Sequence, residues 1–413
     1  MTRAHLGSPW WLRPGVIVAV ALLLRLAWLW WVPVEPVADS VLYDAFAKSI
    51  ADGRGYAFPS GDLTVYWPVG ASAVYAVIYA IFGSQEWAAA LFQALLGGAI
   101  VGLTWRLARA PLGREAAALA AWFTALWPLL IEFTTILASE LLFIALVLAA
   151  LNAWSAQGLQ PVRRAVLWGA LICAASYVRP TAWPLLVLFP LLAWWVDRQW
   201  RPAMLMLLVS VSTAAALFAP WVYRNYQLFD RFVLVAANGG PNLWMGNNPA
   251  SNGGYMPLPD KAFKNEVERD RYYGREAIEF IKSHPLDYLK LSASRVVMTY
   301  DRETIGVVWN ERGLTRRFGV PTLMALKLVS TAYWWTMLAL GAIGAYRMVR
   351  EHRVSVLWPL VAATLFLATV PILTVAQDRY HVPIDPLLGI FAAWGALGLG
   401  RRARSALRRQ QHA

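Results

Sequence analysis

Residues 354–375 read VSVLWPLVAATLFLATVPILTV, a run that contains no ionisable side chain. A helix that crosses the hydrocarbon core of a bilayer needs about 20 predominantly apolar residues, and this run is long enough. Of the 413 residues in the chain, 59% are hydrophobic, and the mean hydropathy is +0.46. One soluble core cannot bury so much apolar surface. The sequence therefore predicts an all-α polytopic membrane protein.

The strong positive charge indicates membrane topology rather than nucleic-acid binding. The formal net charge is +13, but the arginines fall in short clusters between apolar runs, such as residues 347–353 and 401–409. A nucleic-acid surface needs basic residues along one polar face. Lys and Arg in short loops instead mark the cytoplasmic side of a membrane. Cys173, the single cysteine, lies in an apolar run, so no disulfide is expected.

Applying the length rule and the charge rule together gives about ten spans with both termini in the cytoplasm. The expected spans are residues 11–32, 87–107, 116–130, 136–154, 166–178, 182–196, 203–223, 322–346, 354–375 and 382–399. The first of them is expected to be retained, because no small-residue cleavage site follows it. Residues 66–82 are apolar but short, and a crossing there would place Arg106, Arg109 and Arg114 outside. We therefore expect an interfacial or re-entrant helix in this segment.

The spans divide the chain into three parts. Residues 1–223 form an N-terminal transmembrane core, in which residues 33–86 are the first external loop. Residues 224–320 are rich in turns and mixed in charge, which predicts a small external domain. Residues 321–413 contain the last spans and a basic cytoplasmic tail.

Several ionisable residues lie where these spans meet the external side. Ionisable groups beside or within spans are costly and mark sites by default. The group comprises Asp39, Glu140, Arg179, Arg224, Asp378, Arg379 and His381. Carboxylates and guanidiniums are thus predicted to converge on one face of the bilayer.

Each of these residues also has a plain structural interpretation. Arg25, within the first span, either extends to the headgroups or pairs with an acid such as Glu140. Arg179 and Arg224 would serve equally as interfacial anchors. Asp301 and Glu303 are typical of a solvated, charged helix face. The five histidines are scattered singly, a pattern that does not predict a histidine metal site.

Seven short motifs follow one another along the chain. The first three are Asp39-Ser-Val-Leu-Tyr43 with Gly53-Arg-Gly-Tyr56, Tyr66-Trp-Pro-Val-Gly70, and Ser139-Glu140. The next two are Val178-Arg-Pro-Thr181 and Pro220-Trp221 with Arg224-Asn-Tyr226. The last two are Asn238-Gly-Gly-Pro-Asn242-Leu-Trp244-Met-Gly-Asn-Asn248-Pro249 and Asp378-Arg-Tyr-His-Val-Pro383. In this order the motifs resemble those of the GT-C glycosyltransferases, in the branch of the protein O-mannosyltransferases and the lipid A aminoarabinose transferases. The resemblance covers about residues 15–400.

The resemblance implies a GT-C-like bundle with interfacial helices in its first external loop. It also implies an inverting glycosyltransferase that moves a sugar from a polyprenyl-phosphate carrier to a cell-envelope acceptor, whether lipid, glycan or protein. The expected location is the bacterial inner membrane, with the active site facing the periplasm. No cofactor is firmly implied, and a divalent cation, Mg²⁺ or Mn²⁺, is the one to consider. Nucleic acid is not an expected partner.

The resemblance also assigns roles to residues. Asp39 is the expected catalytic base, with Glu140 as a second acid. Arg179, Arg224 and Arg379 are expected to bind the donor phosphate, because a guanidinium is always charged and binds phosphate oxygens bidentately. The expected substrate-binding residues are Tyr43, Tyr66, Asn242, Trp244, Asn248, Tyr380 and His381.

Two other classes of function fit the same composition. A lipid-linked sugar flippase or small-molecule transporter would also need many spans and interfacial cations, together with inverted repeats or helices broken at the midplane. The sequence shows neither of these features. A surface polysaccharide polymerase or ligase would use similar chemistry on a different acceptor.

Overall fold

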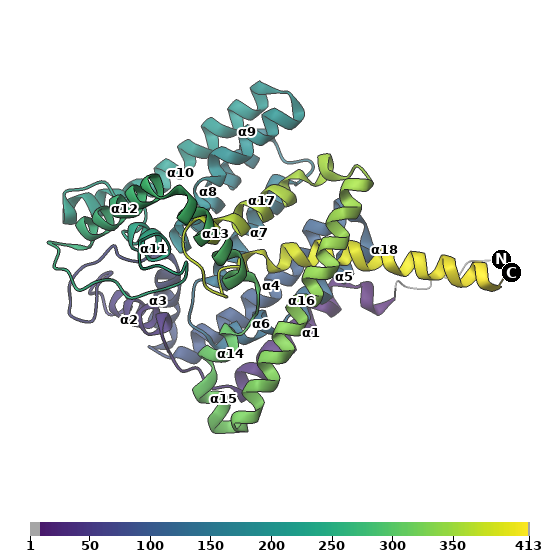
Figure 1. The fold of residues 1–413 in the computed structure, drawn as a ribbon, viewed down its shortest axis with the longest axis horizontal. Helices are drawn as coiled ribbons and strands as arrows, with labels where there is room; N and C mark the ends of the chain where they lie inside the picture. The colour runs from purple at the N-terminus through teal and green to yellow at the C-terminus, as the bar shows by residue number, and fades with distance from the viewer. Residues whose placement is uncertain (1–8, 412–413) are drawn as a thin grey trace.

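The protein is a bundle of helices (Figure 1). The computed structural model describes the backbone of residues 9–411 and the side chains of residues 9–401. Within that range there is no strand, and isolated bridges join only Ala57 to Leu63 and Gly254 to Ala376. Seven helices are long and apolar enough to cross a membrane, or eight if one bent pair counts as a single span. The predicted all-α polytopic membrane fold is confirmed.

The helices of the bundle follow the predicted spans closely. They are α1 (Pro14–Trp31), α4 (Glu86–Leu112), α7 (Glu140–Trp154), α8 (Pro161–Val178), α9 (Leu185–Asp197), α10 (Trp200–Phe229), α16 (Val320–Arg350), α17 (Val354–Leu373) and α18 (Asp385–Gln411). The bent pair is α5 (Arg114–Leu126) with α6 (Pro128–Glu132) and the short 3-10 helix η2 (Phe133–Thr135), at an angle of 56°. Because α7 is short and α8 is not apolar enough to count as a span by itself, the number ten remains a prediction.

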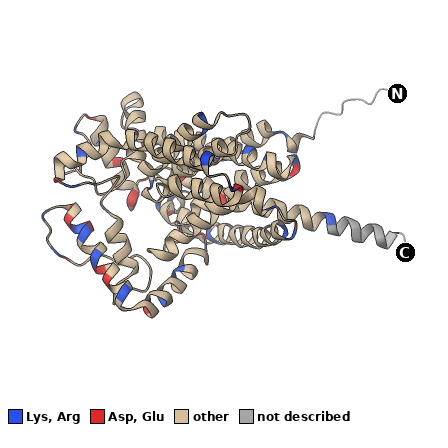
Figure 2. Ribbon diagram, turned by 90° about the horizontal axis from the view of Figure 1, so that it is seen from above, with Lys and Arg blue, Asp and Glu red and all other residues tan. Residues whose placement is uncertain are grey.

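The remaining helices lie in two segments between spans. The first segment, residues 33–86, contains α2 (Asp39–Ala51) and α3 (Gly70–Phe82). The later segment contains α11 (Gly239–Gly246), α12 (Glu266–Ser283), α13 (Pro285–Tyr300), α14 (Ile305–Trp309) and α15 (Glu311–Phe318). With 13 residues, α3 is about 20 Å long, which is less than the hydrocarbon thickness. Charged residues are sparse on most of the bundle and dense on α12 (Figure 2). The short length of α3 agrees with an interfacial helix. The many charged residues of α12 agree with a helix outside the hydrocarbon core.

The last helix, α18, lies in the middle of the bundle. It packs against α16 and α5 and then extends beyond the bundle at the end of the molecule where α1 begins (Figure 1). Its contact with α16 depends on glycine, because a Cβ atom on Gly344 would overlap the carbonyl oxygen of Phe391. Small residues at such crossings allow two membrane helices to approach closely. The resulting packing fixes the position of the turn that precedes α18.

Arg25 in α1 neither reaches the headgroups nor pairs with Glu140. Its side chain is fully buried, and its Nη1 donates hydrogen bonds to the carbonyl oxygens of Ala21 and Ala125 at 3.1 and 3.2 Å. The absence of a side chain at Gly97 leaves room for the guanidinium between α1 and α4. Both sequence-based interpretations of Arg25 were therefore wrong. The guanidinium fits against Gly97 of α4 and binds backbone carbonyls, so it needs neither lipid headgroups nor an acidic partner.

Candidate active site

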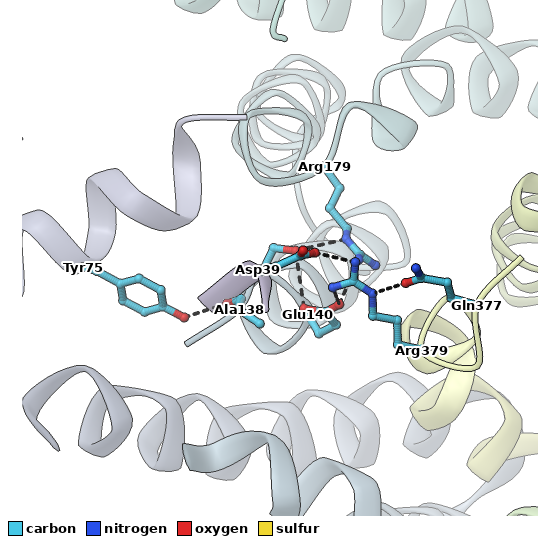
Figure 3. A network of polar contacts seen from close by, with 8 residues as sticks. Asp39, Tyr75, Ala138, Glu140, Arg179, Gln377 and Arg379 are labelled. Carbon is cyan, nitrogen blue, oxygen red and sulfur yellow. Dashed lines mark hydrogen bonds and ion pairs between the residues drawn. The ribbon is translucent and has the colours of Figure 1, made fainter. Parts of the chain in front are cut away.

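Four charged side chains meet beside the loop between α1 and α4, and we call them the carboxylate–guanidinium cluster: Asp39, Glu140, Arg179 and Arg379 (Figure 3). They come from four separate parts of the chain. Asp39 begins α2, Glu140 begins α7, Arg179 follows α8, and Arg379 lies in the turn between α17 and α18. The structure thus brings together the predicted base, the predicted second acid and two of the three predicted phosphate ligands.

Helix ends explain why these residue types occupy these positions. Asp39 and Glu140 are the first residues of their helices, where the partial positive charge of the helix stabilises a carboxylate. Arg179 directly follows the last residue of α8, where a cation is favoured. Pro180 prevents the helix from continuing, so the chain turns and the Arg179 side chain is directed at Glu140.

Arg379 is the centre of the cluster. Its Nη2 donates to Asp39 Oδ2 at 2.5 Å, its Nε donates to Gln377 Oε1 at 2.8 Å, and its Nη1 lies 3.8 Å from Glu140 Oε1. The ring of Trp309 covers the guanidinium at 4.8 Å. Burial disfavours the charged form, but Asp39, Tyr380 and Glu140 outweigh it and hold the pKa of Arg379 above its ordinary value. The guanidinium is therefore a permanent buried cation.

Glu140 is shared by the two arginines. Its side chain is fully buried, and its Oε1 accepts a hydrogen bond from Arg179 Nη2 at 2.9 Å. Arg179 Nε also donates to the hydroxyl of Ser139 at 3.1 Å. Asp39 differs from Glu140 in that about a third of its side chain remains exposed. Of the two carboxylates, only Asp39 is therefore accessible from solvent.

Neighbouring side chains fix the segment that carries Glu140. The Tyr75 hydroxyl in α3 donates to the carbonyl oxygen of Ala138 at 2.6 Å (Figure 3), and Gln93 Nε2 in α4 donates to that of Ile136 at 2.6 Å. Both donors are buried. A buried amide or hydroxyl is costly unless it is paired, so these bonds hold the segment in one conformation. The position of Glu140 is thus determined before any ligand binds.

Three tyrosines predicted to bind substrate lie close to this cluster. Burial raises the pKa of Tyr43 to about 12, and the Glu140 and Asp39 carboxylates act in the same direction. Tyr380 lies between the two arginines, whose guanidinium carbons are 5.9 and 5.4 Å from its ring centre. Tyr66 lies further out, under Arg269 of α12 at 4.5 Å, and burial raises its pKa despite that cation. Tyr43 and Tyr66 therefore remain protonated hydroxyl donors at neutral pH.

Arg224, the third predicted phosphate ligand, lies apart from the cluster. Its Nη1 donates to the carbonyl oxygen of Thr64 at 2.9 Å, and its Nη2 donates to that of Tyr56 at 3.2 Å. The ring of Trp221 covers its guanidinium at 4.6 Å. In this arrangement Arg224 holds the first external loop against α10.

Replacing Arg224 with Gln should therefore loosen the loop more than it weakens donor binding. Losing two hydrogen bonds to buried carbonyls costs roughly 1 to 3 kcal/mol. We expect a lower melting temperature and faster hydrogen exchange in residues 56–65, with the donor KM little changed. A large rise in donor KM with unchanged exchange would instead support the phosphate role that the resemblance implies.

The predicted substrate residues in α11 and just after it form local contacts. Asn248 is buried, and its Nδ2 donates to the carbonyl oxygen of Trp244 at 2.8 Å while its Oδ1 accepts from the amide of Ala250. The Trp244 ring packs on Tyr273 of α12 at 5.1 Å. The amide of Asn242 donates to the carbonyl oxygen of Asn238. Among the described residues, none of these hydrogen bonds reaches the cluster.

His381 faces away from the cluster, towards the interior of the bundle. It is fully buried, stacks on Trp334 at a ring distance of 4.1 Å, and contacts Asp385 through Nδ1 at 3.2 Å. Glu303 lies beside it and is also fully buried. The solvated face predicted for Asp301 and Glu303 is therefore wrong for Glu303, which accepts a hydrogen bond from Trp127 at 2.9 Å.

A cavity of about 480 Å³ opens elsewhere, between residues 231–237 and α12. Arg231, Phe232, Asp270 and Arg271 are among the residues that line it. None of the four residues of the carboxylate–guanidinium cluster does so. The chemistry of the cluster is therefore not centred in this cavity.

Part of the chain matches a known family by sequence. The model of the dolichyl-phosphate-mannose-protein mannosyltransferase family matches residues 67–223. This range contains Glu140 and Arg179, whereas Asp39 and Arg379 lie outside it. No curated protein matches the chain by sequence.

Two solved structures are similar to the chain in fold. One is the archaeal oligosaccharyltransferase AglB from Archaeoglobus fulgidus in complex with an inhibitory peptide and a dolichol-phosphate, at 14% identity and a TM-score of 0.57 over 95% of this chain and 52% of that one. The other is ArnT from Cupriavidus metallidurans bound to undecaprenyl phosphate, at 16% identity and a TM-score of 0.54 over 92% of this chain and 59% of that one. The chain thus spans between about half and three fifths of the length of these structures.

Proposed function

We propose that this chain, which has the fold of the GT-C superfamily of membrane glycosyltransferases, transfers a sugar from a polyprenyl-phosphate carrier to a hydroxyl of a cell-envelope acceptor on the external face of the membrane. The observation that carries the proposal is the carboxylate–guanidinium cluster. It combines one partly exposed carboxylate with two guanidiniums at the edge of the first loop. Such a transfer needs a base for the acceptor and cations for the departing phosphate.

The donor class is supported by the ligands of the related structures. One of them holds a dolichol-phosphate and the other undecaprenyl phosphate, and both ligands join a long isoprenoid chain to a phosphate. Arg179 and Arg379 present the planar, bidentate donors that suit phosphate oxygens. We propose that these two residues bind the phosphate of the carrier. Arg224 instead holds the first external loop against α10.

The proposed reaction is a single displacement. The acceptor oxygen attacks the anomeric carbon of the sugar from the face opposite the carrier, and its proton passes to Asp39. The bond between the anomeric carbon and the phosphate oxygen breaks, and its electron pair stays on the polyprenyl phosphate. Because one unit of negative charge grows on that phosphate, fixed guanidiniums lower the barrier most in the transition state. The sugar configuration is inverted.

The ion pair between Asp39 and Arg379 suggests how donor binding prepares the base. Without donor, Arg379 Nη2 donates a hydrogen bond to the Asp39 carboxylate and occupies its Oδ2. A carrier phosphate that binds part of the Arg379 guanidinium would weaken this pair and free the Asp39 oxygen to accept the proton of the acceptor hydroxyl. The base would then be fully active only when donor is present. Glu140, which is buried between the arginines, is proposed to position them rather than to accept the proton.

The external orientation of the site leads to a labelling prediction. Ser84 is exposed in the turn between α3 and α4, and Cys173 is buried. A Ser84→Cys variant in a Cys173→Ala background should react with a membrane-impermeant maleimide added from outside. Labelling only after the cytoplasmic side is opened would place Asp39 on the other face and overturn the orientation.

The function itself is tested with purified protein, a polyprenyl-phosphate sugar and a panel of envelope acceptors. We expect polyprenyl phosphate to be released only when an acceptor is present and the protein is intact. A flippase would instead move the lipid-linked sugar across liposomes without releasing polyprenyl phosphate. Transport without release would therefore reject the transferase proposal.

A further inference from the structure

A second polar cluster lies inside the bundle, which we call the buried triad: Glu303, His381 and Asp385. Glu303 lies between α13 and α14, His381 lies in the turn before α18, and Asp385 is the first residue of α18. All three side chains are fully buried. Each offers one oxygen or nitrogen atom, and these atoms lie within 4.8 Å of one another. Three separate segments thus direct ligand atoms into one small volume.

Each residue of the triad leaves a polar atom without a partner. Among the described residues, nothing forms a hydrogen bond of good geometry with Glu303 Oε2, His381 Nε2 or Asp385 Oδ2, although the backbone of Arg302 makes a weaker contact with the His381 ring. Their other atoms are engaged, since Glu303 Oε1 accepts from Trp127 Nε1 and Asp385 Oδ1 contacts His381 Nδ1. Buried polar atoms are paired in the great majority of cases, so three unpaired atoms in one place indicate a missing ligand.

The surroundings of the triad favour a cation. Asp378 in the turn adds further negative potential, and no described Lys or Arg forms an ion pair with Glu303 or Asp385. Burial and the nearby Asp385 raise the pKa of Glu303 well above its ordinary value. Two buried carboxylates without a positive partner are costly unless they are protonated or bind a metal. A divalent ion would balance their two charges.

We propose that Glu303, His381 and Asp385 form a binding site for a zinc ion. One imidazole with two carboxylates is a ligand set that zinc accepts, whereas magnesium prefers oxygen ligands and several waters. Trp334, stacked on His381 at 4.1 Å, and Tyr300, at 6.2 Å, enclose the site on the imidazole side. Such an apolar enclosure restricts solvent access to a bound metal.

The ion would act as a structural link close to the active site. His381 lies two residues after Arg379, and Asp385 begins the helix that follows the same turn. Zinc bound to both of them and to Glu303 would fix this turn against the segment between α13 and α14. The site itself does not depend on the proposed transfer reaction, because its ligands do not contact Asp39, Glu140 or Arg179 through any described hydrogen bond.

The first test is the metal content of the full-length protein purified without chelator. Mass spectrometry should find zinc at about one ion per chain. Glu303→Gln and Asp385→Asn should each lower this content at least tenfold, whereas Asp301→Asn, in the same segment but partly exposed, should retain it. Protein stripped with a chelator should have a lower melting temperature, which added Zn²⁺ restores. Co²⁺ added in place of zinc should give visible absorption bands that the Glu303→Gln variant lacks.

A pair of protonated acids is the alternative account of the same geometry, and it predicts different results. In that case the wild-type protein contains no zinc, and neither Zn²⁺ nor Co²⁺ raises its melting temperature. Glu303→Gln would then keep or raise the melting temperature, because a neutral amide resembles a protonated acid. Either result overturns the metal site. The chelator experiment uses unaltered protein, so the proposal stays testable even if a variant fails to fold.

Discussion

Asp39→Asn should lower the rate of sugar transfer by about two to four orders of magnitude, because the substitution keeps the shape of the side chain and removes its basicity. Among the two carboxylates of the cluster, Asp39 is the accessible one, and it begins α2 at the edge of the first loop. The protein should fold normally, because an amide can still accept a hydrogen bond from Arg379. Release of polyprenyl phosphate under saturating donor and acceptor measures the effect.

The control for this prediction is Asp52→Asn. Asp52 lies in the same loop, is half exposed and pairs only with Arg54 among the described residues. Its loss should leave turnover unchanged. Asp44 is a poor control, because it is buried, pairs with Lys48 at 2.7 Å and accepts a hydrogen bond from Tyr79. Ordinary activity in Asp39→Asn, together with loss of activity in Glu140→Gln, would assign the base to Glu140.

The fold was largely predictable from the sequence, because length, apolarity and arginine placement each constrain a membrane chain. The all-helical architecture and the resemblance to the GT-C superfamily are confirmed. Helix ends were less predictable. The expected third span ended at residue 130, whereas the chain bends by 56° between α5 and α6 and continues to Thr135. Pro128 in the sequence was the available signal, since proline begins helices more readily than it continues them.

The active-site residues could be selected from the sequence, but their pairing could not. Asp39 and Arg379 are 340 positions apart, and their common membrane face and the family resemblance were the sequence-based reasons to expect them near each other. The face does not specify which guanidinium meets which carboxylate. That choice depends on the packing of α18 against α5 and α16, which fixes the turn that carries Arg379. Arg224 was also an arginine predicted at the same membrane face, but its guanidinium donates hydrogen bonds to the carbonyl oxygens of Thr64 and Tyr56 instead.

The buried triad shows the limit of reasoning from local charge. Glu303 stands between Arg302 and Thr304, close to Asp301, and such a sequence is typical of a solvated segment. Its burial depends on Trp127, which lies 176 positions earlier in the sequence and donates a hydrogen bond to the Glu303 carboxylate. Likewise, a single histidine does not predict a metal site until distant carboxylates are known to surround it. Contacts of this kind follow from tertiary packing and leave little trace in a short window of sequence.

Arg379→Lys should lower the rate of transfer by about two to three orders of magnitude, the scale that follows removal of one fixed donor from a developing negative charge. The substitution keeps the positive charge but replaces a planar fork with a point charge. Arg379 donates through Nε to Gln377 and through Nη2 to Asp39, and its Nη1 lies 3.8 Å from Glu140 Oε1. A single ammonium group cannot donate to these partners and bind a phosphate at the same time.

The kinetic pattern of this variant separates a catalytic role from an anchoring role. If Arg379 stabilises the charge that grows on the phosphate, kcat should fall much more than the donor KM rises, because the interaction strengthens in the transition state. The matched control is Arg316→Lys, since Arg316 forms an exposed ion pair with Glu35 at 2.9 Å and should tolerate the change. Near-normal kcat in Arg379→Lys, with only a lower melting temperature, would reduce Arg379 to a structural anchor. The phosphate would then have to be bound by Arg179 or by a residue outside the cluster.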